Sequence, residues 1–409
     1  MRELRSDRKW TFAQLAESAE RAPALDGPVA FPQGGSAEFI LSLLRAWRHD
    51  QVVCPLESGQ PPPSVGETPK NIVHLKSTSA TTGQPRLVAL TARQLMADAE
   101  NIIQTMGLRR DWPNLGVISL AHSYGFSNLI TPLLLHGIPL ILLDSPLPDA
   151  LRQATAFLPD HTLPAVPAMW RAWHEAGVIP RNVRLALSAG APLPLPLESD
   201  VFHRSGLKIH NFLGATECGG IAYDTSDEPR EDAACVGGPL QNVHLSITAE
   251  GCLEVRSAAV AETYLPEPGP NLGQGCYRTS DLAELKDNRV LLRGRAGDQI
   301  NVAGRKISPE GIERILLTHP QVRDCLVFGV PSEDDGRSEN ILACVVAHSP
   351  VKAETLRQFL LAQIPAWQVP RDWRFIDSLA ANSRGKLSRA EWREKVGQAS
   401  RMPRHVASR

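Results

Sequence analysis

A hydroxyl-rich segment near residue 80 is the first candidate for chemistry. Five hydroxyls fill six positions, and a glycine and a cation follow, in Ser77-Thr78-Ser79-Ala80-Thr81-Thr82-Gly83-Gln84-Pro85-Arg86. Hydroxyls and free backbone N–H groups in such a turn can surround phosphate oxygens, and an arginine adds a bidentate donor. The segment lacks the Gly-Lys-Ser/Thr end of a Walker loop. On its own, the pattern is more typical of a solvated loop than of a phosphate site.

Two acids stand at the ends of further short segments. Glu217 ends Asn211-Phe212-Leu213-Gly214-Ala215-Thr216-Glu217, and Asp281 ends Tyr277-Arg278-Thr279-Ser280-Asp281. A carboxylate suits a hard cation such as Mg²⁺ or a pair of hydroxyl donors. Taken alone, the first segment is equally typical of a glycine turn with a helix cap, and the second of a turn acid.

Four more segments combine glycine with polar or basic residues. His122 lies in an apolar segment, where a lone histidine is more often a core residue than a ligand. Lys386 lies near the C-terminus, where a lysine is ordinarily solvated. The four segments are residues 121–127, 188–193, 294–307 and 383–389.

The elements that must position these residues alternate between strand and helix patterns. Capping boxes predict helices that begin after Thr11, with Gln14, and after Thr91, with Gln94. A helical pattern spans residues 38–47, and apolar runs predict strands at residues 28–31, 52–55, 72–75, 87–90, 116–120, 138–143, 184–188 and 207–211. The alternation favours an α/β architecture with buried, largely parallel sheets flanked by helices.

The pattern changes in the last third of the chain. After about residue 236, short strands at residues 252–256 and 290–293 predict a β-rich region, and from Asp298 a βαββα-like unit predicts a small α+β domain. We therefore expect a large N-terminal domain at residues 1–296 and a small C-terminal domain at residues 297–396. The basic residues 397–409 are expected to be a disordered tail.

Composition excludes several classes of protein. The 409 residues are 43% hydrophobic, and 43 basic residues nearly balance 44 acidic ones, so bulk charge gives no case for a nucleic-acid partner. Seven cysteines form no C-x-x-C pair, which argues against zinc and a disulfide framework. The N-terminus lacks the apolar core of a signal peptide, and residues 129–143 are too short to span a membrane. We expect a cytoplasmic protein without a membrane span.

The seven segments together resemble, in order, the motifs of the adenylate-forming superfamily, which includes acyl- and aryl-CoA ligases, nonribosomal peptide adenylation domains and luciferases. The hydroxyl-rich loop resembles S-G-T-T-G-x-P-K, and the later segments resemble H-x-Y-G, S-x-G-A-P-L, Y-G-x-T-E, Y-x-T-G-D, G-R-x-D-D-x-I-K-x-x-G-x-x-I and N-G-K-x-x-R. The resemblance covers most of the chain. It implies ATP-dependent, AMP-forming activation of a carboxylic acid, followed by transfer to a thiol, with a C-terminal domain that acts as a lid.

The resemblance also assigns roles to individual residues. It implies that Lys386, Thr216 and Glu217 are catalytic and that Glu217 binds Mg²⁺. The ATP- or AMP-binding residues it implies are Ser79, Thr81, Thr82, Gly83, Arg86, Asn211, Leu213, Gly214, Asp281 and Arg295. The acid-pocket residues are His122, Ser188, Gly190 and Ala191, to which Tyr124 and Trp170 are candidate additions. Gly297 is the hinge and Gly304 lies on the path of the thiol.

The chain departs from the family pattern at several positions. Ala80 and Arg86 replace a usual glycine and lysine, Leu213 stands where a tyrosine often stacks on adenine, and Gly297 replaces a charged hinge residue. About seventy residues precede the phosphate loop, fewer than in typical members.

The leading hypothesis is an acid–CoA ligase that uses ATP, Mg²⁺ and coenzyme A. The 122–127 segment contains no acid to pair an α-amino group, so an aromatic or acyl acid without one is expected. One alternative is loading of the phosphopantetheine arm of an acyl carrier protein, which presents the same thiol. Another is a nucleotide-binding pseudoenzyme, which Leu213 and Gly297 favour and the retained Glu217 and Lys386 oppose.

Overall fold

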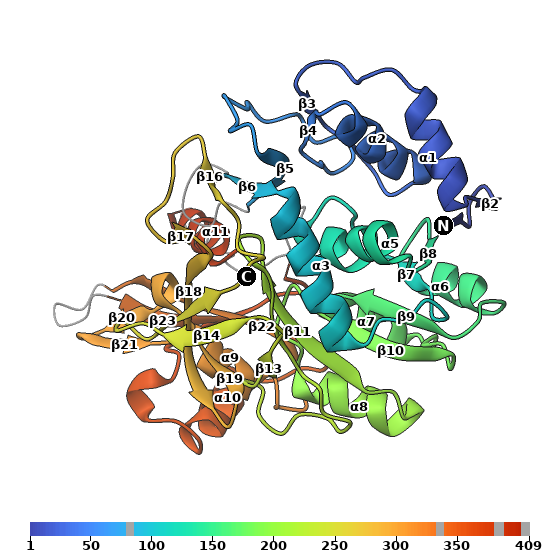
Figure 1. Cartoon of the computed structure of the whole chain (residues 1–409). Coiled ribbons are helices and arrows are strands. Elements are labelled where there is room, and N and C mark those ends of the chain that lie inside the picture. Colours follow the sequence, from blue (N-terminus) through green and yellow to red (C-terminus); the bar gives the residue numbers. More distant parts are fainter. Residues whose placement is uncertain (79–85, 333–338, 380–387, 402–409) are drawn as a thin grey trace. The chain divides into compact units, whose positions relative to one another are not determined.

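The computed structural model describes residues 1–78, 86–332, 339–379 and 388–401 (Figure 1). These residues form two compact bodies. The first contains residues 1–78, 86–279 and 284–291, and the second contains residues 280–283, 292–332, 339–379 and 388–401.

A nine-stranded sheet organises most of the first body. Its five central strands, β7 to β11, run parallel, and antiparallel strands close both edges. In spatial order the strands are β13 (Gly238–Pro239), β12 (Gly219–Tyr223), β11 (Ile209–Ala215), β10 (Val183–Ser188), β9 (His161–Ala165), β7 (Asn114–Gly116), β8 (Leu140–Leu142), β1 (Arg2–Glu3) and β2 (Arg8–Lys9). Parallel strands buried by helices match the alternating pattern of the sequence.

Helices of the first body connect and cover these strands. The two predicted capping boxes are present, at the start of α1 and of α3, so these predictions are confirmed. Helix α3 packs against β12 and against α5. Figure 1 shows α3 and α5 side by side. The helices are α1 (Phe12–Arg21), α2 (Ala37–Arg48), α3 (Ala92–Met106), α4 (Ser123–Gly125), the π-helix η1 (Phe126–Ile130), α5 (Thr131–His136), α6 (Pro148–Thr155), α7 (Pro167–Glu175) and α8 (Leu195–Ser205).

A second, mixed sheet holds the strands on both sides of the hydroxyl-rich loop. Its order is β16 (Thr263–Leu265), β6 (Leu87–Thr91), β5 (Ile72–Ser77), β4 (Val52–Val53) and β3 (Val29–Ala30). Buried apolar side chains such as Leu75 and Leu87 form its core. A third sheet contains β14 (His244–Ile247), β15 (Cys252–Arg256), β18 (Cys276–Lys286) and β17 (Leu272–Gly273), with β19 (Arg289–Arg295) paired to β18.

The second body has its own α+β core. Strands β22 (Val322–Pro331), β23 (Glu339–Ala347) and β24 (Asp372–Phe375) form a sheet, and β20 (Ile300–Val302) pairs with β21 (Arg305–Ile307). Helices α9 (Pro309–Leu316), α10 (Ala353–Leu361) and α11 (Arg389–Arg401) accompany them, with the 3-10 turns η2 (Ala296–Asp298) and η3 (Ala366–Gln368). Leu316, Val327, Val345 and Leu360 are fully buried among its core residues.

Two local predictions are wrong. The strand expected at residues 116–120 ends at Gly116, because the following segment turns beneath the helix that starts at Ser123, where a Cβ on Gly125 would overlap the Ser119 carbonyl. The expected tail begins too early, since α11 continues to Arg401. In the part of the chain that the structure describes, no helix is long and apolar enough to span a membrane.

Candidate active site

The base of the hydroxyl-rich loop is closed by backbone and hydroxyl hydrogen bonds. Strands β5 and β6 pair in antiparallel fashion, and beyond their ends the Thr78 backbone N–H donates to the Arg86 carbonyl at 2.9 Å. The Thr78 hydroxyl donates to the same carbonyl at 3.1 Å. The two strands therefore fix both ends of the loop. The predicted residues Ser79, Thr81, Thr82 and Gly83, like Lys386, lie outside the described residues.

Arg86, Tyr264 and Glu217 form a contiguous cluster beside this loop. Strand β16 pairs with β6, which places Tyr264 opposite Val88 and next to the Arg86 side chain. The Arg86 guanidinium lies 4.0 Å from the centroid of the Tyr264 ring and donates to the Glu267 carbonyl at 3.1 Å. The Tyr264 hydroxyl donates to Glu217 Oε1 at 3.1 Å. A cation and a carboxylate are thus held on one aromatic side chain, and the cation lies at the base of the hydroxyl-rich loop.

Glu217 sits in a tight turn between β11 and β12. Gly219 has a φ of +70°, and a Cβ there would overlap the carboxylate of Asp98 on α3. The Gly220 N–H donates to Asp98 Oδ1 at 2.9 Å, and the Ala261 N–H donates to the Glu217 carbonyl at 2.8 Å. This turn is therefore fixed from both sides, which favours a carboxylate held in one orientation.

The register of the parallel strands places the predicted nucleotide-binding residues of β11. Asn211 on β11 lies opposite Ser188 on β10, so one level of the sheet carries a predicted nucleotide residue and a predicted acid-pocket residue. Leu213 is half-buried and Gly214 is exposed further along β11, and Thr216 is half-buried in the turn. Ligands of such sheets bind beyond the carboxyl ends of the strands, which is where these residues lie.

The predicted acid-pocket residues meet at the same edge of the sheet. Ser188 also lies opposite Ala165 on β9, and the Tyr124 hydroxyl donates to the Ala165 carbonyl at 3.4 Å. The Ser188 hydroxyl is fully buried and has no hydrogen-bond partner among the described residues. Gly190 and Ala191 form an exposed turn after it. Trp170 does not join them: it is fully buried, packs against Trp173 and donates to the Leu187 carbonyl.

An acid from a distant segment accompanies His122. The His122 Nε2 atom lies 3.1 Å from Glu57 Oε1, to which the Ser119 hydroxyl also donates. Both the His122 and Glu57 side chains are about one-third exposed, at 38% and 36%. The sequence segment 122–127 contains no acid, but the structure places the carboxylate of Glu57, sixty-five residues earlier in the chain, beside His122.

In the second body, Asp281 and Arg295 form an ion pair across the β18–β19 hairpin, with Nε 3.0 Å from Oδ1. Gly297 lies in η2 and a Cβ there would meet nothing within 4 Å. Gly304, with φ +80°, lies in the β20–β21 turn and its N–H donates to Asn301. Arg389 binds Asp298, Glu310 and Glu313 at 2.8–2.9 Å, so it holds the start of α11 to this body.

The described residues suit a magnesium ion delivered with a nucleotide. No group of three or more His, Cys, Asp or Glu side chains in the described part of the chain could enclose a metal ion. Mg²⁺ commonly uses one or two carboxylates together with phosphate oxygens rather than a protein cage. Glu217, which is connected through Tyr264 to Arg86 at the base of the phosphate loop, fits this pattern: it would hold the ion, and the ion would neutralise phosphate charge.

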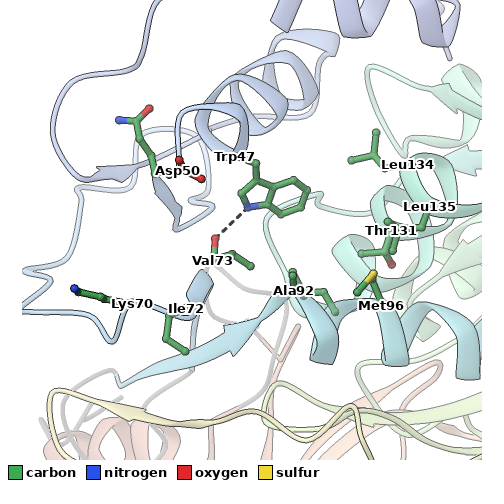
Figure 2. Close-up of a pocket in the computed structure, with 12 residues that line it drawn as sticks. Trp47, Asp50, Lys70, Ile72, Val73, Ala92, Met96, Thr131, Leu134 and Leu135 are labelled. Carbon is green, nitrogen blue, oxygen red and sulfur yellow. Dashed lines mark hydrogen bonds between the residues drawn. The ribbon is translucent and has the colours of Figure 1, made fainter. Parts of the chain in front are cut away.

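A cavity of about 390 Å³ lies elsewhere in the first body and is not the candidate active site (Figure 2). In Figure 2, the Trp47 indole points to the Val73 carbonyl, to which it donates at 3.0 Å, with Leu134, Leu135 and Met96 near it. Ile72 and Val73 line this cavity at the start of β5, whereas the hydroxyl-rich loop follows the end of that strand.

Comparisons with known proteins identify the family of the chain. A family model described as AMP-binding enzyme matches residues 15–265, and its C-terminal domain model matches residues 311–386. A probable 2-succinylbenzoate–CoA ligase of Mycobacterium tuberculosis is 29% identical over 337 residues, covering 77% of this chain and 82% of that protein.

Solved structures share the fold at low sequence identity. ATP-bound MatB from Rhodopseudomonas palustris superposes with a TM-score of 0.84 at 18% identity, covering 96% of this chain and 95% of that one. o-Succinylbenzoate CoA synthetase (MenE) from Bacillus subtilis, in complex with the acyl-adenylate intermediate, has a TM-score of 0.79 at 20% identity, covering 94% and 93%.

The chain belongs to the AMP-binding enzyme family, because the first family model covers more than half of it. The predicted membership of the adenylate-forming superfamily is confirmed, as are the α/β fold with a smaller α+β region and the class of enzyme, an ATP-dependent, AMP-forming acid ligase. A small carboxylic acid is therefore a substrate.

Several site residues are absent from the sequence prediction. Tyr264 has no motif to mark it, because its role depends on the pairing of β16 with β6. Glu57 and Asp98 are separated from their partners by long stretches of chain. Lys76 did carry a signal, since a lysine inside an otherwise buried strand is rare.

Proposed function

We propose that this chain joins an aromatic carboxylic acid without an α-amino group to coenzyme A through an acyl-adenylate. The observation that supports this most directly is the Arg86–Tyr264–Glu217 cluster at the closed base of the hydroxyl-rich loop. The aromatic acid and coenzyme A are suggested by the 2-succinylbenzoate–CoA ligase to which the chain is similar.

The proposed chemistry divides into two steps. The carboxylate oxygen attacks the α-phosphorus of ATP, the bond to pyrophosphate breaks, and a mixed anhydride with AMP forms. A thiolate then attacks the acyl carbon and AMP leaves with the bonding electron pair, so one difficult step becomes two easier ones. Arg86 would bind phosphate oxygens, Glu217 would hold Mg²⁺, and Lys386 would neutralise charge between the acid and the α-phosphate.

The second body would supply the ribose contacts and the exchange between the two steps. Asp281 would accept the ribose hydroxyls, with its orientation held by Arg295. Domain motion at a hinge near Gly297 would replace Lys386 by the Gly304 turn on the path of the thiol. We also propose a cytoplasmic location, which is supported by the seven free cysteines, since thiols persist in a reducing compartment.

Pyrophosphate release with a panel of acids tests this function. Release should require ATP, Mg²⁺ and an aromatic acid together, hydroxylamine should trap the acyl group, and coenzyme A should yield a thioester. α-Amino acids belong in the panel because Glu57 stands beside His122. Amino acids as the preferred substrates would contradict the proposed substrate class. A thioester formed on a phosphopantetheinylated carrier protein but not on coenzyme A would contradict the acceptor, and release independent of every acid would contradict the ligase.

A further inference from the structure

Lys76 is a buried cation in the strand that leads into the phosphate loop. It lies in β5, two residues before Thr78, and is 3% exposed. Its ammonium donates to the hydroxyls of Ser123, at 3.3 Å, and Ser127, at 3.4 Å. The Phe126 ring centroid lies 5.8 Å from its nitrogen. Its direct neighbours are therefore neutral, which is an expensive setting for a charge.

The countercharge is reached through one of these hydroxyls. Ser127 donates to Asp98 Oδ2 at 2.5 Å, and Asp98, also 3% exposed, accepts the Gly220 N–H on its other oxygen. Burial lowers the pKa of Lys76, and the negative charges of Asp98, Cys218 and Glu217 oppose that shift. The fully buried imidazole of His74 has a pKa lowered well below its usual value, chiefly by burial, so it adds no positive charge.

This network joins three segments that carry site residues. Lys76 precedes the phosphate loop, Ser123 follows His122, and Asp98 contacts Gly219 and Gly220 directly after the Glu217 turn. An apolar side chain of similar volume would avoid the cost of burying the ammonium, but it would leave the buried carboxylate of Asp98 without its countercharge. What Lys76 adds over an apolar residue is the ionic link between these segments.

We propose that Lys76 is a positioning residue that holds the Glu217 turn, through Ser127 and Asp98, in a fixed position relative to strand β5, which leads into the phosphate loop. The inference rests on the proposed function only where nucleotide binding is concerned. The position of the turn itself is a property of the protein without ligands, so the two parts can be tested separately.

Amide hydrogen exchange of the full chain without ligands, compared among variants, tests the position of the turn. In Lys76→Met, exchange across residues 217–220 should rise about tenfold because the charge that holds Asp98 is lost. The matched control is Lys208→Met, which removes another buried lysine of the first body, bonded to Glu198 and Asp224. Because Asp224 follows the far end of β12, this control should leave exchange in residues 217–220 unchanged.

Calorimetric titration with MgATP tests the consequence for the site. Lys76→Met should weaken MgATP binding about five- to tenfold, whereas Lys208→Met should bind as the wild type does. If Lys76→Met fails to fold, Ser127→Ala provides the same test, because it cuts the link and keeps both charges.

Wild-type exchange at residues 217–220 in Lys76→Met, or an equal rise in exchange at these residues in both lysine variants, would overturn the proposal. Raised exchange with unchanged MgATP affinity would overturn its link to the nucleotide site. A wild-type protein that binds no MgATP would contradict the proposed function and leave the exchange result to decide the role of Lys76.

Discussion

Two buried lysines of the first body differ in how their charge is satisfied. Lys208, at the start of β11, bonds directly to Glu198 and to Asp224, and Arg230 completes the cluster through Glu198. Lys76 contacts hydroxyls, and its countercharge Asp98 stands behind one of them. The Lys208 cluster pairs two cations with two anions in direct contact, whereas the Lys76 link passes through neutral groups.

The difference indicates separate roles for the two lysines. The Lys208 cluster ties helix α8 to strand β11 and to the end of β12, with Arg230 also donating to the Cys235 and Leu193 carbonyls. The members of this cluster are scaffold residues. Lys208 precedes β11, whereas the predicted nucleotide-binding residues of that strand begin at Asn211 and continue toward its other end. The Lys76 network touches the turn of Glu217 itself. Direct pairing thus stabilises the sheet, and the bridged pair orders a functional loop.

The largest expected effect comes from breaking the direct cluster. Glu198 is fully buried and binds both Lys208 and Arg230, so Glu198→Gln leaves excess positive charge in the interior. We expect the free energy of unfolding of the first body to fall by about 3–5 kcal/mol, against about 1–3 kcal/mol for Lys76→Met. Urea unfolding followed by tryptophan fluorescence measures both.

The same samples should show the reverse order in nucleotide binding. Glu198→Gln, if folded at the assay temperature, should retain wild-type MgATP affinity, because it contacts no predicted site residue. If Lys76→Met lost as much stability as Glu198→Gln, Lys76 would stabilise the first body as strongly as the Lys208 cluster does. That result would contradict separate roles for the two lysines.

A smaller effect is expected on the opposite side of the Glu217 turn. Tyr264→Phe removes the hydroxyl that donates to Glu217 and keeps the ring on which Arg86 lies. We expect the KM for MgATP in adenylate formation to rise about three- to tenfold, with kcat and unfolding little changed, since one hydrogen bond to a charged group is lost. Steady-state pyrophosphate release measures both constants.

Tyr223→Phe is the matched control for this change. Tyr223 is buried on β12 and stacks on His210 at 5.4 Å, away from Glu217. It should leave the KM unchanged. An equal rise in both variants would mean that the Tyr264 hydroxyl has no specific role, and an unchanged KM in Tyr264→Phe would show that this hydroxyl does not set the orientation of Glu217.

The fold was largely predictable because its signals are local. The boxes at Thr11 and Thr91 define helix starts by residues three apart, and the strand β15 has the predicted bounds. The strand predicted at residues 116–120 failed because the close approach of Gly125 to Ser119 depends on a helix packed from outside the segment.

The candidate site was predictable where motifs carry it and not where packing does. Glu217 and Arg86 could be chosen from their segments, but the Tyr264 side chain that joins them comes from a strand pairing with no sequence signature. Asp98 resembles any polar residue on a helix until β12 is placed against α3. Residues in the same register, such as Ser188 and Asn211, likewise meet only once the strand order is known.

The smallest expected effect is the pH dependence that Lys76 gives to stability. Burial lowers its pKa in the folded protein, whereas the unfolded chain has the ordinary value of about 10.5. Between the folded pKa and the unfolded one, the unfolded state binds more protons, so the free energy of unfolding rises with pH. The Lys76→Met variant lacks this titrating group, so its free energy of unfolding has no such contribution. The stability of the parent minus that of the variant should therefore grow as pH increases toward 10.5.

This comparison needs its neighbouring charges held constant. His74, Asp98, Glu217 and Cys218 face Lys76, and a cysteine thiol ordinarily has a pKa of about 8.5, within the pH range of the experiment. Urea unfolding of the Cys218→Ala protein, with and without Lys76→Met, at several pH values from neutral to 10 isolates the lysine. If the stability difference between parent and variant stayed constant or fell with rising pH, the charge of Lys76 would be as well stabilised in the folded protein as in the unfolded chain. Lys76 would then not be a cation buried at a cost among neutral groups.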